Sequence, residues 1–109
     1  MKQVENLLRV MVNGDKEAKI TTVAVTPTPT LFTSQLANGF PRKSICVYNN
    51  SNSASGECYY GYSNAITPSS GSRPIPLGSV IEIPVTTNIP VYFSCVAGEL
   101  GDIRVEEIA

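Results

Sequence analysis

Short runs in which apolar and polar residues alternate, each ended by Gly, Pro or Asn, constrain this chain more than any other feature. Alternation with a period of two puts every second side chain on one face of a β-strand. In residues 102–108, Ile103 and Val105 are therefore expected to point inward. The side chains expected to meet water in this segment are Asp102, Arg104 and Glu106. The pattern predicts strands packed in layers around one apolar core.

The same alternation recurs along the chain and predicts about seven or eight strands. We expect them at residues 8–12, 16–25, 31–36, 42–49, 57–62, 80–85, 89–96 and 102–108. Residues 63–76 are rich in polar residues and prolines and are expected to form a long loop. This count and spacing, with no secure helix, are typical of an all-β fold: a single β-sandwich or jelly-roll-like domain. The order of the strands does not follow from one sequence.

The first 25 residues carry two competing signals. Asn13-Gly14 is the strongest two-residue hairpin signal and lies between two expected strands. A helix over residues 1–12, ended by Gly14, competes with the hairpin, so strand and helix both stay open there. The residues at helical spacing are Val4, Leu7, Leu8 and Met11. We favour the hairpin because the β-branched residues that follow need a partner strand.

A Thr-Pro stretch at residues 26–30 suggests how the chain is divided. Each proline pushes the residue before it toward an extended conformation, so this stretch is predicted to be a spacer. The expected organisation is an N-terminal hairpin or arm at 1–25, the spacer at 26–30 and a sandwich body at 31–109. Such an arm would be placed to add a strand to a neighbouring subunit.

Charge and hydropathy argue against two classes of partner. The net charge is -1 and the eight basic residues are scattered, so we expect no nucleic-acid binding. The apolar runs are far shorter than the roughly 20 residues of a spanning helix, so we expect no membrane association. Residues 1–9 carry Glu5 and Asn6 where a signal peptide would be apolar, so we expect no export signal.

The residue types that usually carry catalysis or bind metals are few. The chain has no histidine, which removes the commonest general base and metal ligand. Cys46, Cys58 and Cys95 lack metal-ligand spacing and are expected to be reduced thiols, with one disulfide and a spare thiol as the alternative. Glu106 and Glu107 are adjacent on a strand and diverge to opposite faces. We expect a non-enzymatic protein without a cofactor or metal site.

Tyrosine is the remaining candidate for function, because its flat face and polar tip suit interfaces and sugar-binding surfaces. Cross-strand pairs and core edges are the simpler interpretation, and the lack of tryptophan weakens a sugar site. A subunit interface would use tyrosines together with apolar residues of the arm. The interface candidates are Leu8, Val10, Met11, Val12, Ile20, Tyr59, Tyr60, Tyr62 and Tyr92.

The order of several motifs resembles small virion proteins of tailed bacteriophages. The central one is the strand Arg42-Lys43-Ser44-Ile45-Cys46-Val47-Tyr48-Asn49-Asn50-Ser51. Nearly the whole chain takes part, although each motif alone is weak. The others are Leu7-Leu8-Arg9-Val10 with 16–22, Tyr60-Gly61-Tyr62-Ser63, Ile66-Thr67, Ser70-Gly71, 74–78, Ile81-Glu82-Ile83, Val91-Tyr92 and 102–106. Leu77-Gly78 departs from the pattern, which usually has proline before that glycine.

The resemblance implies a β-sandwich located in the virion and assembled as a homo-oligomer, commonly a trimer. It implies a capsid decoration or cement protein, or a head-fibre protein, that binds the major capsid protein or another virion protein. A tail-fibre, spike or baseplate module that contacts host-surface carbohydrate or a receptor is the alternative. The resemblance carries over no catalytic residue. For the matched residues Arg42, Lys43, Tyr48 and Asn49, a structural role suits best. Arg42 and Asn49, at the ends of the strand, can satisfy backbone groups and hold the adjacent loops in place.

Overall fold

The computed structural model describes residues 16–39, 41–51 and 57–109, which form eight strands. The expected strand at 8–12, its Asn13-Gly14 turn and the alternative helix lie outside these residues. The described part contains no helix, and so none that is long and apolar enough to cross a membrane. The strands are β1 (Ala18–Val25), β2 (Thr30–Leu31), β3 (Ser44–Asn49), β4 (Cys58–Gly61), β5 (Ser72–Ile75), β6 (Val80–Ile83), β7 (Tyr92–Cys95) and β8 (Gly101–Ile108).

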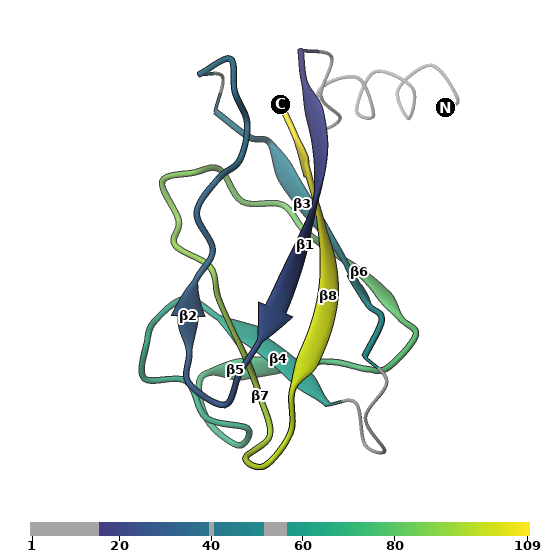
Figure 1. Cartoon of the computed structure of the whole chain (residues 1–109). Coiled ribbons are helices and arrows are strands. Elements are labelled where there is room, and N and C mark those ends of the chain that lie inside the picture. Colours follow the sequence, from purple (N-terminus) through teal and green to yellow (C-terminus); the bar gives the residue numbers. More distant parts are fainter. Residues whose placement is uncertain (1–15, 40, 52–56) are drawn as a thin grey trace, which may run out of the picture.

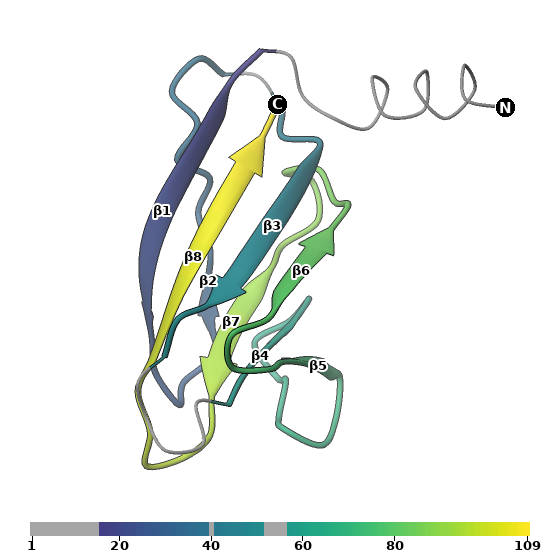
Figure 2. The ribbon, with the colours of Figure 1, turned by 90° about the vertical axis from the view of Figure 1, so that its right-hand side faces the viewer.

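The strands form two antiparallel four-stranded sheets that face each other (Figure 1). One sheet, here called sheet A, has the order β1-β8-β3-β6 and is seen face-on in Figure 2. The other, sheet B, has the order β2-β7-β4-β5. The prediction of an all-β sandwich is therefore confirmed.

The pairing is nested, and this nesting explains the strand order. Strand β1 pairs with β8, β2 with β7, β3 with β6 and β4 with β5, as in one long folded hairpin. Rolling that hairpin up adds the pairs β3–β8 and β4–β7, which complete the two sheets. An eight-stranded double sheet rolled in this way is a jelly roll.

The core lies between the sheets and is built from the inward half of each alternating pattern. On β8, Ile103 and Val105 are fully buried, as the sequence predicts; on the adjacent β3, Val47 lies opposite Val105 and the buried Asn49 lies opposite Ile103. Phe32 and Phe93 meet edge to face, with ring centroids 6.0 Å apart. The buried cluster is Val25, Phe32, Ile45, Val47, Cys58, Tyr60, Ile75, Ile83, Val91, Phe93, Cys95, Ile103 and Val105.

The N-terminal boundary of the body differs from the expectation. Strand β1 pairs with β8 along its whole length and is an edge of the sandwich, although we assigned residues 1–25 to an arm. Residues 26–29 cross from sheet A to sheet B, and the Thr26 carbonyl accepts hydrogen bonds from the Cys95 N–H and the Ser94 hydroxyl, both at 3.1 Å. The Thr-Pro stretch is thus anchored to β7 and belongs to the body.

Two further expectations about strands are wrong in extent. Of the strand expected at 31–36, only Leu31 lies in β2 (Thr30–Leu31); the Phe32 N–H still donates to the Val91 carbonyl, and residues 33–36 are not a strand. The loop expected at 63–76 contains β5, whose Pro74 is compatible with an edge strand because a proline there leaves no ladder hydrogen bond unmade.

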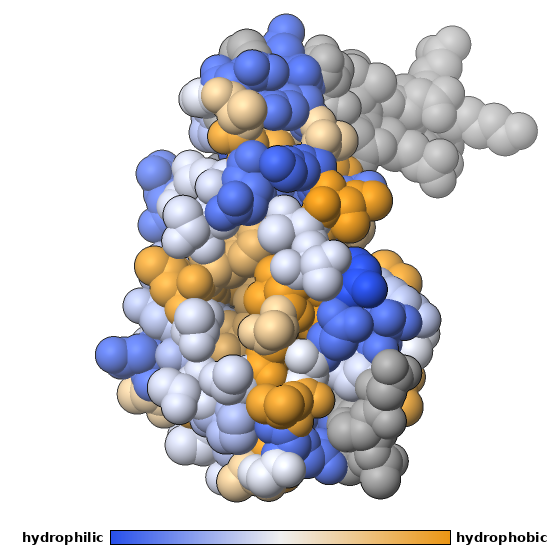
Figure 3. Space-filling view, viewed as in Figure 1, coloured by the Kyte–Doolittle hydropathy of each residue, from blue (hydrophilic) through white to orange (hydrophobic). Residues whose placement is uncertain are grey.

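The two sheets differ in what covers their outer faces. Residues 62–71 fold over the outside of sheet B, where Ile66 is buried against Gly61 of β4. Figure 2 shows sheet A with no described segment in front of it. The sandwich is also open along one side, where apolar side chains reach the surface between β1 and β2 (Figure 3). We call this opening the β1–β2 groove; it includes Val23, Val25, Phe32 and Phe93.

Candidate functional site

The outer side of sheet A, here called the open face, is the candidate interaction surface. The register aligns its outward side chains in rows across four strands. One row runs Ile20, Glu106, Cys46 and Glu82. The next row runs Thr22, Arg104, Tyr48 and Val80. Alternation therefore builds a flat mixed surface rather than a cleft.

The open face mixes exposed apolar side chains, most of them at its edges, with charged side chains on β8 and at Glu82 of β6. Ile20 at the β1 edge is 63% exposed and Val80 at the β6 edge is 66% exposed, and Tyr48 lies beside Val80. Between these flanks β8 carries Asp102, Arg104 and Glu106, and the Arg104 guanidinium pairs with the Asp102 carboxylate. The open face thus presents exposed apolar side chains beside charged ones, and another protein surface could bury the former and pair with the latter.

Cys46 lies in the middle of the open face with a carboxylate on each side. Its cross-strand neighbours are Glu106 and Glu82. Burial raises the pKa of the Cys46 thiol, and the negative charges of Glu82 and then Glu106 raise it further. At a given pH this thiol has less thiolate, the reactive form, than an ordinary cysteine.

We expect Cys46 to react slowly with a disulfide reagent at pH 8, with a rate that still rises above pH 9, because its pKa lies above the usual 9.0. The Glu82→Gln variant removes one of the charges and should react faster at pH 8. Stopped-flow thiol titration measures the rate, and Glu57→Gln, an exposed glutamate before β4, is the control. Equal rates for both variants would contradict this assignment.

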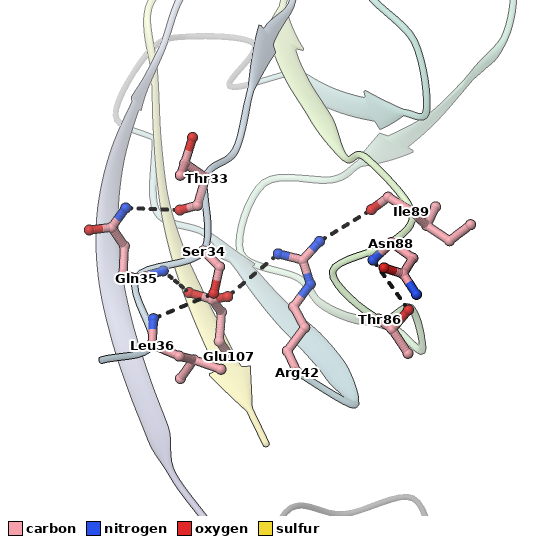
Figure 4. Close-up of polar contacts among 9 residues, drawn as sticks. All are labelled: Thr33, Ser34, Gln35, Leu36, Arg42, Thr86, Asn88, Ile89 and Glu107. Carbon is pink, nitrogen blue, oxygen red and sulfur yellow. Dashed lines mark hydrogen bonds and ion pairs between the residues drawn. The ribbon is translucent and has the colours of Figure 1, made fainter. Parts of the chain in front are cut away.

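A buried ion pair joins β8 to the segment just before β3 (Figure 4). Glu107 on β8 is fully buried, and its carboxylate accepts from the Arg42 guanidinium at 3.4 Å and from the Gln35 N–H at 2.7 Å. Arg42, just before β3, also donates to the Ile89 carbonyl at 3.3 Å and lies over the Phe32 ring. Three segments far apart in sequence are thereby held together.

This ion pair has a structural role, because it holds separate segments of the chain together. It joins β8 to residues 32–36 and to the loop before β7, while the Arg42 Nε is buried without a hydrogen-bond partner among the described residues. The structural role expected for Arg42 agrees with these contacts. Asn49 acts similarly, because its side-chain amide donates to the Ile75 carbonyl and its side-chain oxygen accepts from the Ser51 N–H. The Glu107 site was missed, although parity with Ile103 and Val105 already puts Glu107 inward.

A second concave feature, here called the tyrosine hollow, lies at the β4–β5 side. Tyr60 and Tyr62 meet edge to face with centroids 6.1 Å apart, and Arg73 of β5 is opposite Tyr60. Burial raises the pKa of the Tyr62 phenol, the neighbouring Tyr60 adds to the rise, and Arg73 opposes it. The hollow has a volume of about 470 Å³ and is lined by Tyr60, Gly61, Tyr62, Gly71, Ser72 and Arg73.

The interface candidates predicted from the sequence lie in different environments in the structure. Ile20 lies on the open face, whereas Tyr59 and Tyr60 are buried inside this chain. Tyr62 is half exposed in the tyrosine hollow, and Tyr92 is partly buried on β7. The four candidates at 8–12 lie outside the described residues; they are Leu8, Val10, Met11 and Val12.

The three cysteines are free; Cys58 and Cys95 are buried, and Cys46 is partly buried. Cys58 and Cys95 face each other across β4 and β7, and burial raises the pKa of both thiols. Among the described residues, no group of three or more His, Cys, Asp or Glu side chains could hold a metal ion.

No protein-family model matches the chain, and neither a curated protein nor a solved structure matches it. The candidate function therefore rests on the motifs of the sequence and on the surfaces described above.

Proposed function

We propose that this protein is a non-enzymatic structural component of a tailed-phage virion, a capsid decoration or head-fibre protein that binds the particle surface. The observation that carries the proposal is the open face, which presents Ile20, Tyr48 and Val80 around a charged stripe. The ordered series of virion-protein motifs gives the class of partner. Jelly rolls are common in viral capsid and lectin domains, which supports the proposal by analogy only.

The open face suits attachment to another protein for a physical reason. Burying exposed apolar side chains gains about 25 cal/mol per Å² of apolar surface, so Ile20, Tyr48 and Val80 favour a docked state. The stripe of alternating charge on β8 would select a partner of complementary pattern and suppress wrong ones. Docking by this face leaves residues 62–71, which cover sheet B, on the side away from the partner.

We expect the protein to bind empty, expanded phage heads at a fixed stoichiometry and to raise their resistance to heat. Val80→Lys places a charge in the docking surface and should weaken binding about tenfold, which is ~1.4 kcal/mol. Leu100→Lys, at an equally exposed apolar residue in the β7–β8 turn, is the control. Co-sedimentation with heads measures binding. Retained affinity of the Val80 variant, or no binding of the native chain, would refute the assignment.

The tyrosine hollow favours a second candidate function, a tail-fibre or baseplate module that contacts host-surface carbohydrate. Tyr62 offers a half-exposed aromatic ring, and Arg73 a hydrogen-bond donor beside it. In that case Tyr62→Ala should reduce binding to host cells about tenfold, while Tyr48→Ala on the open face should not. Cell pull-down with labelled protein separates the two candidates, since decoration of heads predicts the reverse sensitivity.

A further inference from the structure

The sandwich has four edge strands, and they differ in how well they are protected. Strand β2 has two residues, β6 has four, and β5 has four including Pro74. Short length and proline are common means by which proteins block pairing at a sheet edge. Strand β1 has eight residues, contains no proline, and has only Lys19 as a charged side chain. It is therefore the one long unprotected edge in the described part of the chain.

The hydrogen bonds show which backbone groups of β1 point outward. Glu17 and Ala109 exchange both their hydrogen bonds, at 3.2 and 2.8 Å, and bonded pairs alternate along an antiparallel ladder. On the other side of β8, the Asp102 carbonyl bonds the Asn50 N–H, so the even residues of β8 serve β3. The residues of β1 that turn their N–H and C=O groups away from β8 are Ala18, Ile20, Thr22 and Ala24.

We propose that β1 pairs antiparallel with β1 of a second copy, around a two-fold axis at Thr21. In this register Ala18 bonds Ala24 of the other copy, and Ile20 bonds its Thr22. All four outward residues then find partners in both copies, so one sheet of eight strands forms. An interface of this kind is self-complementary, as two-fold symmetry requires.

Two independent observations support this register. The hydroxyl oxygen of Thr21 is buried and has no hydrogen-bond partner among the described residues. On the axis it would face its own counterpart in a non-bonded pair, where a rotation about χ1 allows a Thr–Thr hydrogen bond. The register also places Lys19 opposite Val23 of the second copy, so the only charged side chain of β1 is not opposite the same lysine of its partner.

The pairing would also cover apolar surface that the single chain leaves open. Ile20 would pack against Thr22 of the second copy on the outer side. On the inner side, the β1–β2 groove, with a volume of about 250 Å³ and lined by Val23, Val25 and Phe93, opens at this edge and would be flanked by the second copy. The inference concerns self-association and does not depend on the virion role.

The first test is the mass of the full chain by light scattering, with the dimer at twice 11.7 kDa. Thr22→Pro removes an outward N–H without removing a bond to β8, and should raise the dimer dissociation constant at least about tenfold. Thr22→Val keeps that N–H and is the matched control. A monomeric native chain, or equal association of both variants, overturns the proposal.

Cross-linking tests the register even if the proline variant fails to fold. Opposed Cα atoms in a non-bonded pair lie about 4.5 Å apart, within disulfide range. Under mild oxidation by a glutathione disulfide buffer, two Thr21→Cys chains should form a covalent dimer with release of reduced glutathione. Val23→Cys, displaced from the axis, is the control, and the native chain with its three thiols gives the background. Cross-linking of Val23→Cys as efficient as that of Thr21→Cys, or none for either, overturns the register.

Discussion

The Glu107→Gln variant is expected to lose about 3–5 kcal/mol of unfolding free energy, because it leaves the Arg42 guanidinium buried without its counter-charge. Glutamine keeps the shape of the side chain, so the loss reports charge and not volume. Urea unfolding at neutral pH measures it: the midpoint should fall while the slope stays constant.

The adjacent Glu106 provides a matched control, because it lies on the same strand but on the open face. Glu106→Gln should change stability by no more than about 0.5 kcal/mol. The double variant Arg42→Met with Glu107→Gln should recover much of the loss, since replacing both members of a buried pair is often tolerated. Similar losses at 106 and 107 would show that the buried pair contributes little.

The Gly61→Ala variant is expected to destabilise the protein by about 1–3 kcal/mol through overpacking. An added Cβ would lie 2.3 Å from the Ile66 Cγ2 and 2.6 Å from the Gly71 carbonyl oxygen. The second contact is with backbone, so a change of rotamer does not relieve it. The segment that covers sheet B must shift, and thermal unfolding should show a midpoint several degrees lower.

Two further variants separate the clash from other effects. Gly98→Ala meets no atom within 4 Å but has a φ of 86°, so it reports backbone strain alone, about 1 kcal/mol. In an Ile66→Ala background, Gly61→Ala should cost less, because one of the two clashing atoms is gone. An unchanged cost in that background would mean that Ile66 does not lie against Gly61.

The Glu107 and Gly61 variants have the largest expected effects on stability, and both affect residues that hold a covering segment against a sheet. A two-layer sandwich must hold its covering segments onto its sheets. The Arg42–Glu107 pair fastens residues 32–36 and the loop before β7. The absence of a side chain at Gly61 lets Ile66 seal the outside of sheet B. The open face is left as the broad sheet surface that no described segment covers.

Local pattern predicted much of the fold. Alternation along β8 assigned Ile103 and Val105 to the inward side of their strand, and both are buried. It failed at β5, because a short edge strand containing Pro74 has the same composition as a loop. It did not reveal that β1 pairs with β8, because the sequence of a strand does not show which distant strand lies beside it.

The candidate interface residues were also predicted only in part. The sequence picked out Ile20 and Tyr62, which are exposed, but also Tyr59 and Tyr60, which are buried. Tyrosine has an apolar ring and a polar hydroxyl, so a tyrosine in the sequence does not show whether the side chain will be buried in the core or exposed at the surface. The pairing of Glu107 with Arg42 was out of reach for a different reason: 65 positions separate them, and only the rolled fold brings them into contact.

By itself, then, the sequence determined the period of two, and with it the strands and the faces of those strands that avoid water, because side-chain direction in a strand is set by neighbours along the chain. The tertiary structure alone decided which strands pair and, among the described residues, which edge is unprotected and which sheet face no segment covers. Those outcomes depend on contacts between residues far apart in the chain, and hydrophobic burial drives such contacts without specifying partners.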